Sequence, residues 1–249
     1  MFATPRLARL AGRRVFPARA LPDSAYDTDL HLHTDYTDGR STIAEMLAAA
    51  SAAGLAAVAF TEHVRRGADW FPGFYDEVQR QAEAFSGLDV LIGIEAKALD
   101  EEGALDADWP LIERAELVLG AFHNYPDGRG GFCDPAELSA REAALCEFRA
   151  SWGLLAHPDV DVLAHPGALT RRRFGEFPDA YTRQLVRKAV RERKAIELNG
   201  EYATPADLSR MLAWCREEDA WVTLGSNAHH ASEVGRIGRM VQEAFCHAC

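Results

Sequence analysis

The sequence predicts an α/β fold, a distorted seven-stranded parallel β/α barrel with helices on its outside. From Tyr26 onward, short apolar runs alternate with longer helical patterns, which is the order expected of βαβ units. Most runs, such as Ala57-Val58-Ala59-Phe60, are apolar at successive positions, as in strands covered on both faces. Seven such runs without a Pro/Gly/Ser-rich linker favour one closed barrel over a six-stranded doubly wound sheet.

The expected elements follow one another in a regular order. The strands are expected at residues 27–34, 56–62, 90–96, 117–123, 160–165, 195–199 and 221–226. The helices are expected at residues 42–53, 74–85, 135–154, 181–194, 205–218 and 232–246. The first helix has the clearest boundaries, because Thr42 and Glu45 form a capping box at its start and Gly54 follows its end.

The N-terminal segment is basic and differs in pattern from the rest. Before Asp23 it contains no acid, and its arginines are Arg6, Arg9, Arg13, Arg14 and Arg19. A secretory signal needs a continuous apolar core, which these arginines interrupt. We therefore expect residues 1–25 to form a loose basic arm and residues 26–249 to form a single domain.

Charge and cysteine content narrow the class of protein. The formal net charge of −11 argues against nucleic-acid binding, because phosphate backbones are held mainly by clustered Lys and Arg. A small anionic substrate remains compatible with this charge, since bound cations can reverse the local potential. The odd number of scattered cysteines indicates a reducing compartment. Because the chain also lacks the roughly 20-residue apolar run of a membrane span, we expect a cytoplasmic protein.

The positions of the histidines point to a site. Six of them lie at or just beyond the C-terminal end of an expected strand: His31, His33, His63, His123, His165 and His229. In parallel β/α barrels this end of the strands carries the active site. His31 and His33 lie two residues apart, so their imidazoles point to the same side of an extended strand. Asp38 and Glu95 fall on the same rim.

This combination of side chains predicts a metal centre. One histidine at a strand end is more often structural than a ligand, but six histidines with two carboxylates are hard to explain in that way. Glu95 ends an apolar strand, where a cation would offset the cost of burying its charge. Imidazole and carboxylate ligands suit zinc, manganese or iron, and three or fewer protein ligands per ion leave room for a catalytic water.

The motifs resemble those of the polymerase-and-histidinol-phosphatase (PHP) superfamily, in the family's order. They are Asp29-Leu30-His31-Leu32-His33-Thr34, Asp38-Gly39, Thr61-Glu62-His63, Glu95, His123, Leu163-Ala164-His165-Pro166 and Gly225-Ser226-Asn227-Ala228-His229. The resemblance implies a distorted seven-stranded barrel and phosphoester hydrolysis with two or three divalent metal ions at the C-terminal rim. Paired cations would lower the pKa of a shared water, so that a metal-bound hydroxide attacks phosphorus.

Carried over residue by residue, the resemblance also implies a ligand set. His31, His33 and the position of Asn227 would hold the first ion. Glu95 would bridge this ion to a second one, held by His123 and His165. Asp38, His63 and His229 would hold a third. Asp38, His229 and Asn227 are the residues that the resemblance places closest to catalysis.

Asn227 departs from the family pattern, which normally has Asp at this position. A neutral amide can ligate through its carbonyl oxygen, but it carries no negative charge and takes up no proton at ordinary pH. We expect weaker occupancy of the first site, with activity lowered, shifted to another substrate, or absent.

Four side chains near the rim are candidates for binding substrate. Arg65 and Arg66 follow His63, and a guanidinium beside a metal site suits phosphate recognition; a solvated loop charge explains the pair equally well. Arg172, in the run of arginines at 171–173, is a second candidate clamp, and Asn199 lies at a strand end where it can contact substrate.

Three functions are compatible with the sequence. The first is a phosphatase acting on a small phosphorylated metabolite such as histidinol phosphate. The second is a nucleotidase or exonuclease of the same superfamily, which the acidic composition disfavours except for a mononucleotide substrate. The third is a binding or regulatory protein in which Asn227 has impaired catalysis.

Overall fold

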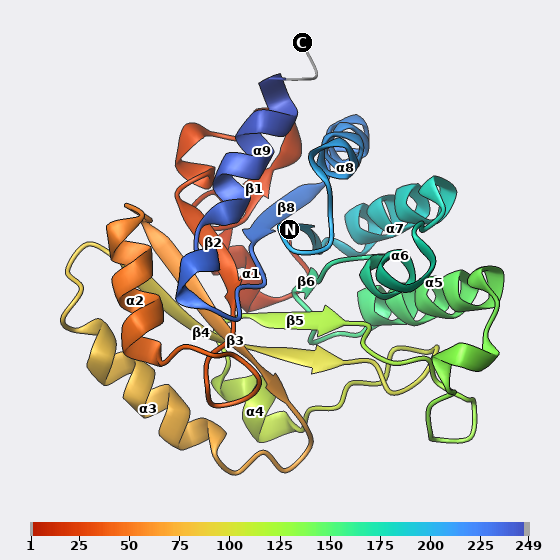
Figure 1. Cartoon of the computed structure of the whole chain (residues 1–249), viewed down its shortest axis with the longest axis horizontal. Helices are drawn as coiled ribbons and strands as arrows, with labels where there is room; N and C mark the ends of the chain where they lie inside the picture. Colours follow the sequence, from red (N-terminus) through yellow and green to blue (C-terminus); the bar gives the residue numbers. More distant parts are fainter. Residues whose placement is uncertain (1, 247–249) are drawn as a thin grey trace.

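A single curled β-sheet organises the protein, whose computed structural model describes residues 2–246 (Figure 1). Its strand order is β1-β8-β7-β6-β5-β4-β3-β2. The parallel strands are β2 (Thr28–Leu32), β3 (Ala57–Val64), β4 (Asp89–Lys97), β5 (Val118–Ala121), β6 (Val162–Leu163), β7 (Ala195–Asn199) and β8 (Trp221–Gly225). An additional short strand, β1 (Phe16–Pro17), pairs with β8 in the antiparallel direction. The α/β class is confirmed, but the expected count of seven strands is wrong because it omits β1.

The two ends of the sheet approach each other at the C-terminal rim. Leu32, at the end of β2, forms an isolated parallel bridge with Ala228, just beyond β8. The His33 amide donates to the Ala228 carbonyl at 2.9 Å, and the Ala228 amide donates to the His31 carbonyl at 3.2 Å. This short bridge joins the two sides of the curled sheet at the rim where His31 and His33 lie.

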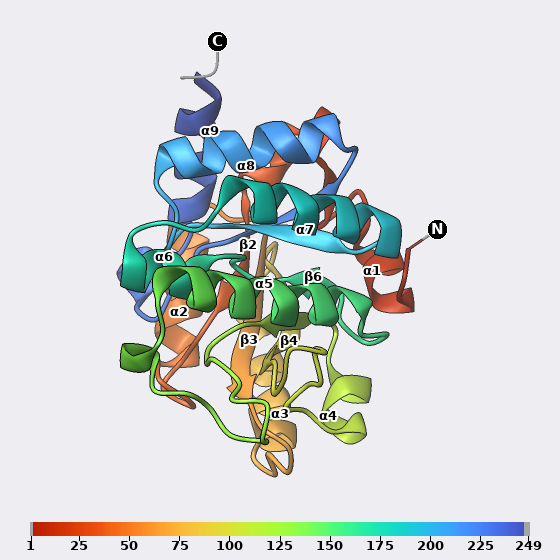
Figure 2. The same ribbon diagram turned by 90° about the vertical axis from the view of Figure 1, so that its right-hand side faces the viewer.

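Helices cover the outside of the sheet. They are α1 (Pro5–Leu10), α2 (Ile43–Ala52), α3 (Phe71–Ala82), α4 (Trp109–Arg114), α5 (Ala140–Ala156), α6 (Ala168–Phe174), α7 (Asp179–Glu192), α8 (Pro205–Glu217) and α9 (Arg236–Cys246). Four of them, α5 to α8, form one layer along a side of the sheet, and α2 and α3 lie on the opposite side (Figures 1 and 2). The expected capping box is present, since the Thr42 side chain accepts from the Glu45 amide and Glu45 accepts from the Thr42 amide. The sequence did not predict α4 or α6.

The interior of the barrel is a separate small core. Strand residues such as Leu30, Ala59 and Leu119 contribute to it. Leu7 and Val15, from the N-terminal segment, belong to the same buried cluster and are 0% exposed. Figure 2 shows α1 at the end of the sheet opposite α6. The N-terminal segment therefore closes the end of the barrel opposite the rim where His31, His63 and His165 lie.

An ion pair fixes this segment in place. Arg6 Nε lies 2.8 Å from Asp161 Oδ2, and the Asp161 side chain is fully buried. Asp161 also accepts from the Val118 amide at 2.9 Å and from the Thr4 hydroxyl. The expectation that residues 1–25 form a loose basic arm is thus wrong for the described part, residues 2–25, which packs against the barrel.

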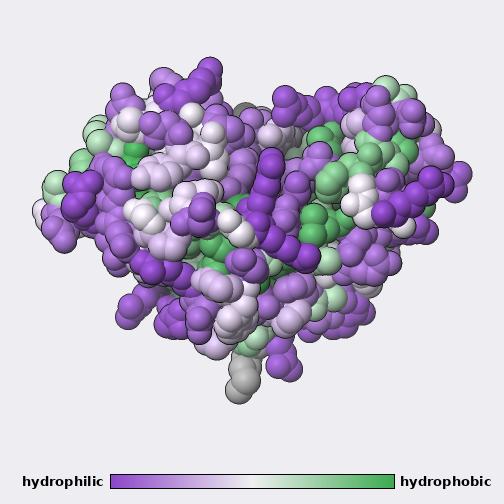
Figure 3. Space-filling view, turned by 90° about the horizontal axis from the view of Figure 1, so that it is seen from below, coloured by the Kyte–Doolittle hydropathy of each residue, from purple (hydrophilic) through white to green (hydrophobic). Residues whose placement is uncertain are grey.

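The face shown in Figure 3 is mostly hydrophilic, with apolar side chains exposed in separate groups. Across residues 2–246, no helix combines the length and the apolar character that crossing a bilayer requires.

Candidate metal centre

Strand alternation carries the ligands to the open end of the barrel. On β3, Ala59 belongs to the interior core, and His63 lies four residues further along on the same face. On β4, Leu91 belongs to that core and Glu95 lies four residues further on. The parallel register pairs His63 directly with Glu95. Apolar side chains therefore fill the lower part of the barrel, and the candidate ligands lie at its mouth.

A β-bulge explains how β2 presents two histidines. Asp29 pairs with Val58 and Leu32 with Phe60, so β2 has one more residue than β3 over this stretch. Leu30 faces the interior core, and the bulge then lets the next residue, His31, face the site as well. The sequence correctly indicated that His31 and His33 share a face.

Glu95 is the centre of the site. It is 1% exposed, and imidazole nitrogens surround its two carboxylate oxygens. Oε1 lies 2.8 Å from His165 Nε2, 3.2 Å from His123 Nε2 and 3.4 Å from His31 Nε2. Oε2 lies 2.8 Å from His63 Nδ1 and 3.5 Å from His33 Nε2. Five imidazoles from four strands or strand ends thus converge on one buried carboxylate of β4.

A second group lies nearer to solvent. Asp38 Oδ2 is 3.4 Å from His63 Nε2, and Asp38 Oδ1 is 3.3 Å from His229 Nε2. The Asp38 side chain is 58% exposed, against 0% for that of Glu95. Gly39 lets this loop fold back closely, because a Cβ at this position would lie 2.7 Å from the His33 carbonyl oxygen. Asp38 therefore stands at the outer edge of the mouth.

The donor set fits metal ions. Among the described residues, three groups have ligand atoms within 4.8 Å of one another: His33, Asp38, His63 and His229; His31, His33 and Glu95; and His63, Glu95 and His123. His31 Nε2, His33 Nδ1 and Glu95 Oε2 are buried without a hydrogen-bond partner. Buried polar atoms are rarely left unsatisfied, so atoms that converge in this way indicate a site for cations.

Electrostatics point in the same direction. Burial alone would raise the pKa of Glu95, but the charges of His123, His31 and His63 hold it well below its ordinary value. Burial lowers the pKa of His63, yet the Glu95 and Asp38 carboxylates outweigh this and raise it to about 10. The Glu95 and Asp38 carboxylates thus favour positive charge at His63, whether from a proton or from metal ions.

Comparison with known proteins identifies the family of this chain. A family model described as "PHP domain" matches residues 29–201. The chain belongs to the PHP family. The resemblance inferred from the motifs is confirmed.

Relatives of this PHP protein include proteins named "Probable phosphatase". That of Syntrophotalea carbinolica is 31% identical over 221 residues, which are 85% of this chain and 84% of the relative. That of Acetivibrio thermocellus is 29% identical over 221 residues, with 85% and 83% covered.

Solved structures of the same fold include a histidinol phosphate phosphatase from Lactococcus lactis, in complex with zinc, L-histidinol and phosphate. It has a TM-score of 0.66 and 20% identity, covering 87% of this chain and 93% of the other. A putative histidinol phosphatase from Listeria monocytogenes has a TM-score of 0.64 and 13% identity, covering 84% and 97%. These likenesses show that the chain shares the fold of these two structures.

Two residues of the PHP site escaped the sequence analysis. Glu197, on β7, accepts from His31 Nδ1 at 2.6 Å and from the His165 amide at 2.7 Å. With one proton held on Nδ1, His31 would present its Nε2 lone pair to a cation beside Glu95, so Glu197 is placed to orient a candidate ligand. Glu62, which accepts from the Thr34 amide and hydroxyl, lies 3.9 Å from His33 Nδ1. Glu197 stands in the apolar run Ala195–Asn199, the same signal that identified Glu95.

Asn227 lies within the cluster. It adopts a left-handed backbone conformation with φ 53°, and it is 4% exposed. Its Oδ1 is 3.0 Å from His33 Nε2, and its Nδ2 donates to Glu201 Oε2 at 2.6 Å. The carbonyl end of the amide thus faces the expected ligands of the first ion.

An open hollow of about 630 Å³ lies beside the centre. Asp38, His63, Glu95 and His123 line it, together with Arg65, Arg66, Trp70 and Lys97. The Arg65 guanidinium has no partner in the described part of the chain, whereas Arg66 Nη2 donates to the Leu105 carbonyl at 3.0 Å. Both predicted arginines border the hollow, but the Arg66 guanidinium is tethered to the Leu105 carbonyl and that of Arg65 is not.

The other two predicted substrate residues lie elsewhere. Asn199 Nδ2 donates to Glu197, and Asn199 Oδ1 accepts from the Glu201 and Tyr202 amides. Arg172 is exposed on α6, with its guanidinium carbon 6.0 Å from the centre of the Tyr202 ring. Neither borders the 630 Å³ hollow.

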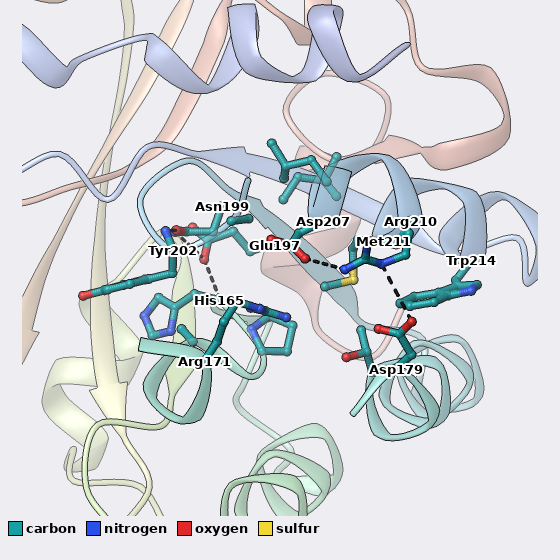
Figure 4. A pocket seen from close by; sticks show the side chains of 16 residues that line it. His165, Arg171, Asp179, Glu197, Asn199, Tyr202, Asp207, Arg210, Met211 and Trp214 are labelled. Atoms are coloured by element: carbon teal, nitrogen blue, oxygen red, sulfur yellow. Dashed lines mark hydrogen bonds and ion pairs between the residues drawn. The ribbon is translucent and has the colours of Figure 1, made fainter. Parts of the chain in front are cut away.

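Asn199 instead lines a narrow cavity of about 30 Å³ behind His165, shown in Figure 4. At its other end Arg210 pairs with Asp207 at 2.6 Å and lies 3.7 Å from Asp179. Arg210 is thus already paired, and the cavity has room for about one water.

Proposed function

We propose that this PHP protein is a metal-dependent phosphoesterase that hydrolyses a small phosphomonoester, such as histidinol phosphate or a related metabolite. One observation carries the proposal: the buried Glu95 carboxylate lies among five imidazoles at the barrel mouth and opens onto the hollow that Arg65 borders. The names of the relatives support the reaction class.

The residues divide into three ligand groups. His31, His33 and Asn227 Oδ1 would hold the first ion, and Glu95 would link it to a second ion at His123 and His165. A third ion fits between Asp38, His63 and His229. Divalent cations bound there would activate water and neutralise charge on the phosphoryl oxygens.

The remaining residues hold the ligands and the substrate. Glu197 would keep the His31 proton on Nδ1. The Asp38 oxygens face the Nε2 atoms of His63 and His229, as expected of three side chains that share one ion. Arg65 is placed to bind a phosphoryl oxygen, because its charged donors are free at the wall of the hollow. The 630 Å³ of the hollow suits a small metabolite, since ligand pockets typically measure about 300–1,000 Å³.

The test is release of inorganic phosphate after loading the protein with zinc, manganese or iron(II). The substrates are histidinol phosphate, a 5′-mononucleotide and a short oligonucleotide. We expect hydrolysis of the small phosphomonoesters and at least about a hundredfold loss in Glu95→Gln, since even residues behind the ligands are worth 10–100-fold. Exposed Glu176→Gln serves as the matched control.

Two outcomes would overturn the proposal. Cleavage of the oligonucleotide without hydrolysis of small phosphates would indicate a nuclease. Stoichiometric metal without any turnover would indicate a binding or regulatory protein.

Alanine variants of Arg65 and Arg66 test the assignment of Arg65 to phosphate binding. Arg65→Ala is expected to lower kcat/KM by about 10–100-fold, the value of one hydrogen bond to a charged group. Arg66→Ala should change it little, because its guanidinium already donates to the Leu105 carbonyl. Equal effects of the two substitutions would contradict this assignment.

A further inference from the structure

Glu201 lies directly across the sheet ladder from Asn227. The parallel register pairs Asn199 with Gly225, and the Gly200 amide donates to the Gly225 carbonyl at 2.8 Å, so the pairing continues past the strand ends. Two residues beyond this pair stand Glu201 and Asn227. Their side chains meet, with Asn227 Nδ2 donating to Glu201 Oε2 at 2.6 Å.

This contact decides which end of the amide faces the metal centre. An asparagine can present either its carbonyl oxygen or its amino group, and only the oxygen can bind a cation. A carboxylate accepts hydrogen bonds and donates none, so Glu201 selects the orientation in which Nδ2 faces it. Oδ1 then points to His33 Nε2, 3.0 Å away, and His33 Nε2 is itself 3.5 Å from Glu95 Oε2.

Charge explains why Asn and Glu occur together. An Asp at position 227 would place a second carboxylate at the 2.6 Å contact with Glu201, and like charges at that distance are unfavourable. Asn227 and Glu201 together carry one negative charge, as a single Asp ligand would. The charged acceptor also polarises the amide and increases the negative character of Oδ1.

We propose that Glu201 is a positioning residue for the first metal site, which holds the Asn227 carbonyl oxygen toward the cation and contributes the negative charge that Asn227 lacks. The inference rests on the metal centre of the proposed function but not on any particular substrate. It replaces the sequence-based expectation that Asn227 simply weakens the site.

Metal affinity of the full chain, rather than turnover, is the test. Zinc affinity and stoichiometry are measured by competition with a chelator, and the visible spectrum of the cobalt(II) form reports the ligand geometry. The variants are Glu201→Gln, Asn227→Ala and the exchanged pair Asn227→Asp/Glu201→Gln, with Glu176→Gln as the exposed control. Thermal unfolding of the metal-free forms checks that each variant is folded.

We expect Glu201→Gln and Asn227→Ala each to weaken zinc binding at the first metal site by about 10–100-fold. This is the range for residues that orient ligands. The exchanged pair restores one negative charge at position 227, so its affinity should return to within about threefold of wild type, a difference well below one orienting contact. Its cobalt spectrum should return as well.

Several results would overturn the inference. Unchanged affinity in Glu201→Gln would do so, as would a folded exchanged pair that stays weak. Unchanged affinity in Asn227→Ala with a loss in Glu201→Gln would make Glu201 itself the ligand. A chain that binds metal but hydrolyses no phosphoester leaves this inference intact and refutes only the proposed function, whereas a chain that binds no metal refutes both.

Discussion

Replacing Glu197 by Gln tests whether the metal centre depends on the orientation of its ligands. The Glu197 carboxylate accepts from His31 Nδ1 at 2.6 Å, from the His165 amide at 2.7 Å and from Asn199 Nδ2 at 3.2 Å. A glutamine has nearly the same shape, but it offers one acceptor oxygen and one amino group. At least one of these donors must then face another donor.

Each orientation of the glutamine has a cost. With its oxygen toward His31, the buried His165 amide loses its acceptor, which costs about 1–3 kcal/mol of folding free energy. With its amino group toward His31, the imidazole proton moves to Nε2, the nitrogen that faces Glu95 at 3.4 Å. Loss of this orientation is worth about 10–100-fold in metal affinity, or roughly 1.4–2.8 kcal/mol.

Chelator competition with zinc and urea unfolding of the metal-free protein measure the two effects. We expect Glu197→Gln to lower both quantities and exposed Glu176→Gln to lower neither. If metal affinity and unfolding free energy both stayed within error of wild type, Glu197 would not orient the ligands and the reasoning would be refuted.

Three further predictions concern the barrel, one at the site and two at its opposite end. A Cβ at position 225 would lie 2.1 Å from Glu197 Oε1. Gly225→Ala should therefore reduce metal affinity, measured by zinc competition. It should also lower the free energy of urea unfolding by about 1–3 kcal/mol, the range for overpacking. Arg6→Ala should lower the free energy of urea unfolding by about 3 kcal/mol, since it leaves the buried Asp161 carboxylate without its cation. Burial lowers the pKa of Lys194 from 10.5 to about 8. Between pH 8 and 10.5 the unfolded chain therefore binds more protons than the folded one, and the free energy of unfolding should rise with pH. Relative to Lys194→Met, the rise should be about 3 kcal/mol.

The controls differ for each prediction. Arg9→Ala is the exposed match for Arg6→Ala and should leave the unfolding free energy nearly unchanged. For Lys194, the test is the difference between wild type and variant across pH 7 to 11, in which the shared titrations cancel; a flat difference would contradict the lowered pKa. A Gly225→Ala variant with wild-type zinc affinity would show that Glu197 and His31 can move aside.

Local sequence signals predicted the elements with strong boundaries. The expected strand 195–199 matches β7, because its apolar run is bounded by Lys194 and Gly200. The expected helix 205–218 ends one residue beyond α8, which has a capping box formed by Thr204 and Asp207. The positions of the histidines also indicated correctly that they share one rim, since strand ends of a parallel sheet meet on one side.

Features that depend on tertiary contacts could not be predicted in this way. The short helices α4 and α6 lack side-chain caps, and α6 follows Gly167 at φ 80°. The burial of Leu7 and Val15 among arginines arises from contact with distant strands. The meeting of Glu201 with Asn227 depends on the register between β7 and β8, which no pattern within either segment encodes.

The pairing of β1 with β8 has a consequence for biosynthesis. Phe16 pairs with Val222, so this edge joins segments about 200 residues apart. During translation, Leu7 and Val15 leave the ribosome early but find their complete surroundings only when the last strand emerges. Contacts between such remote segments form late, and apolar surface stays exposed until then. Nascent chains that stop before β8 are therefore expected to bind chaperones or aggregate.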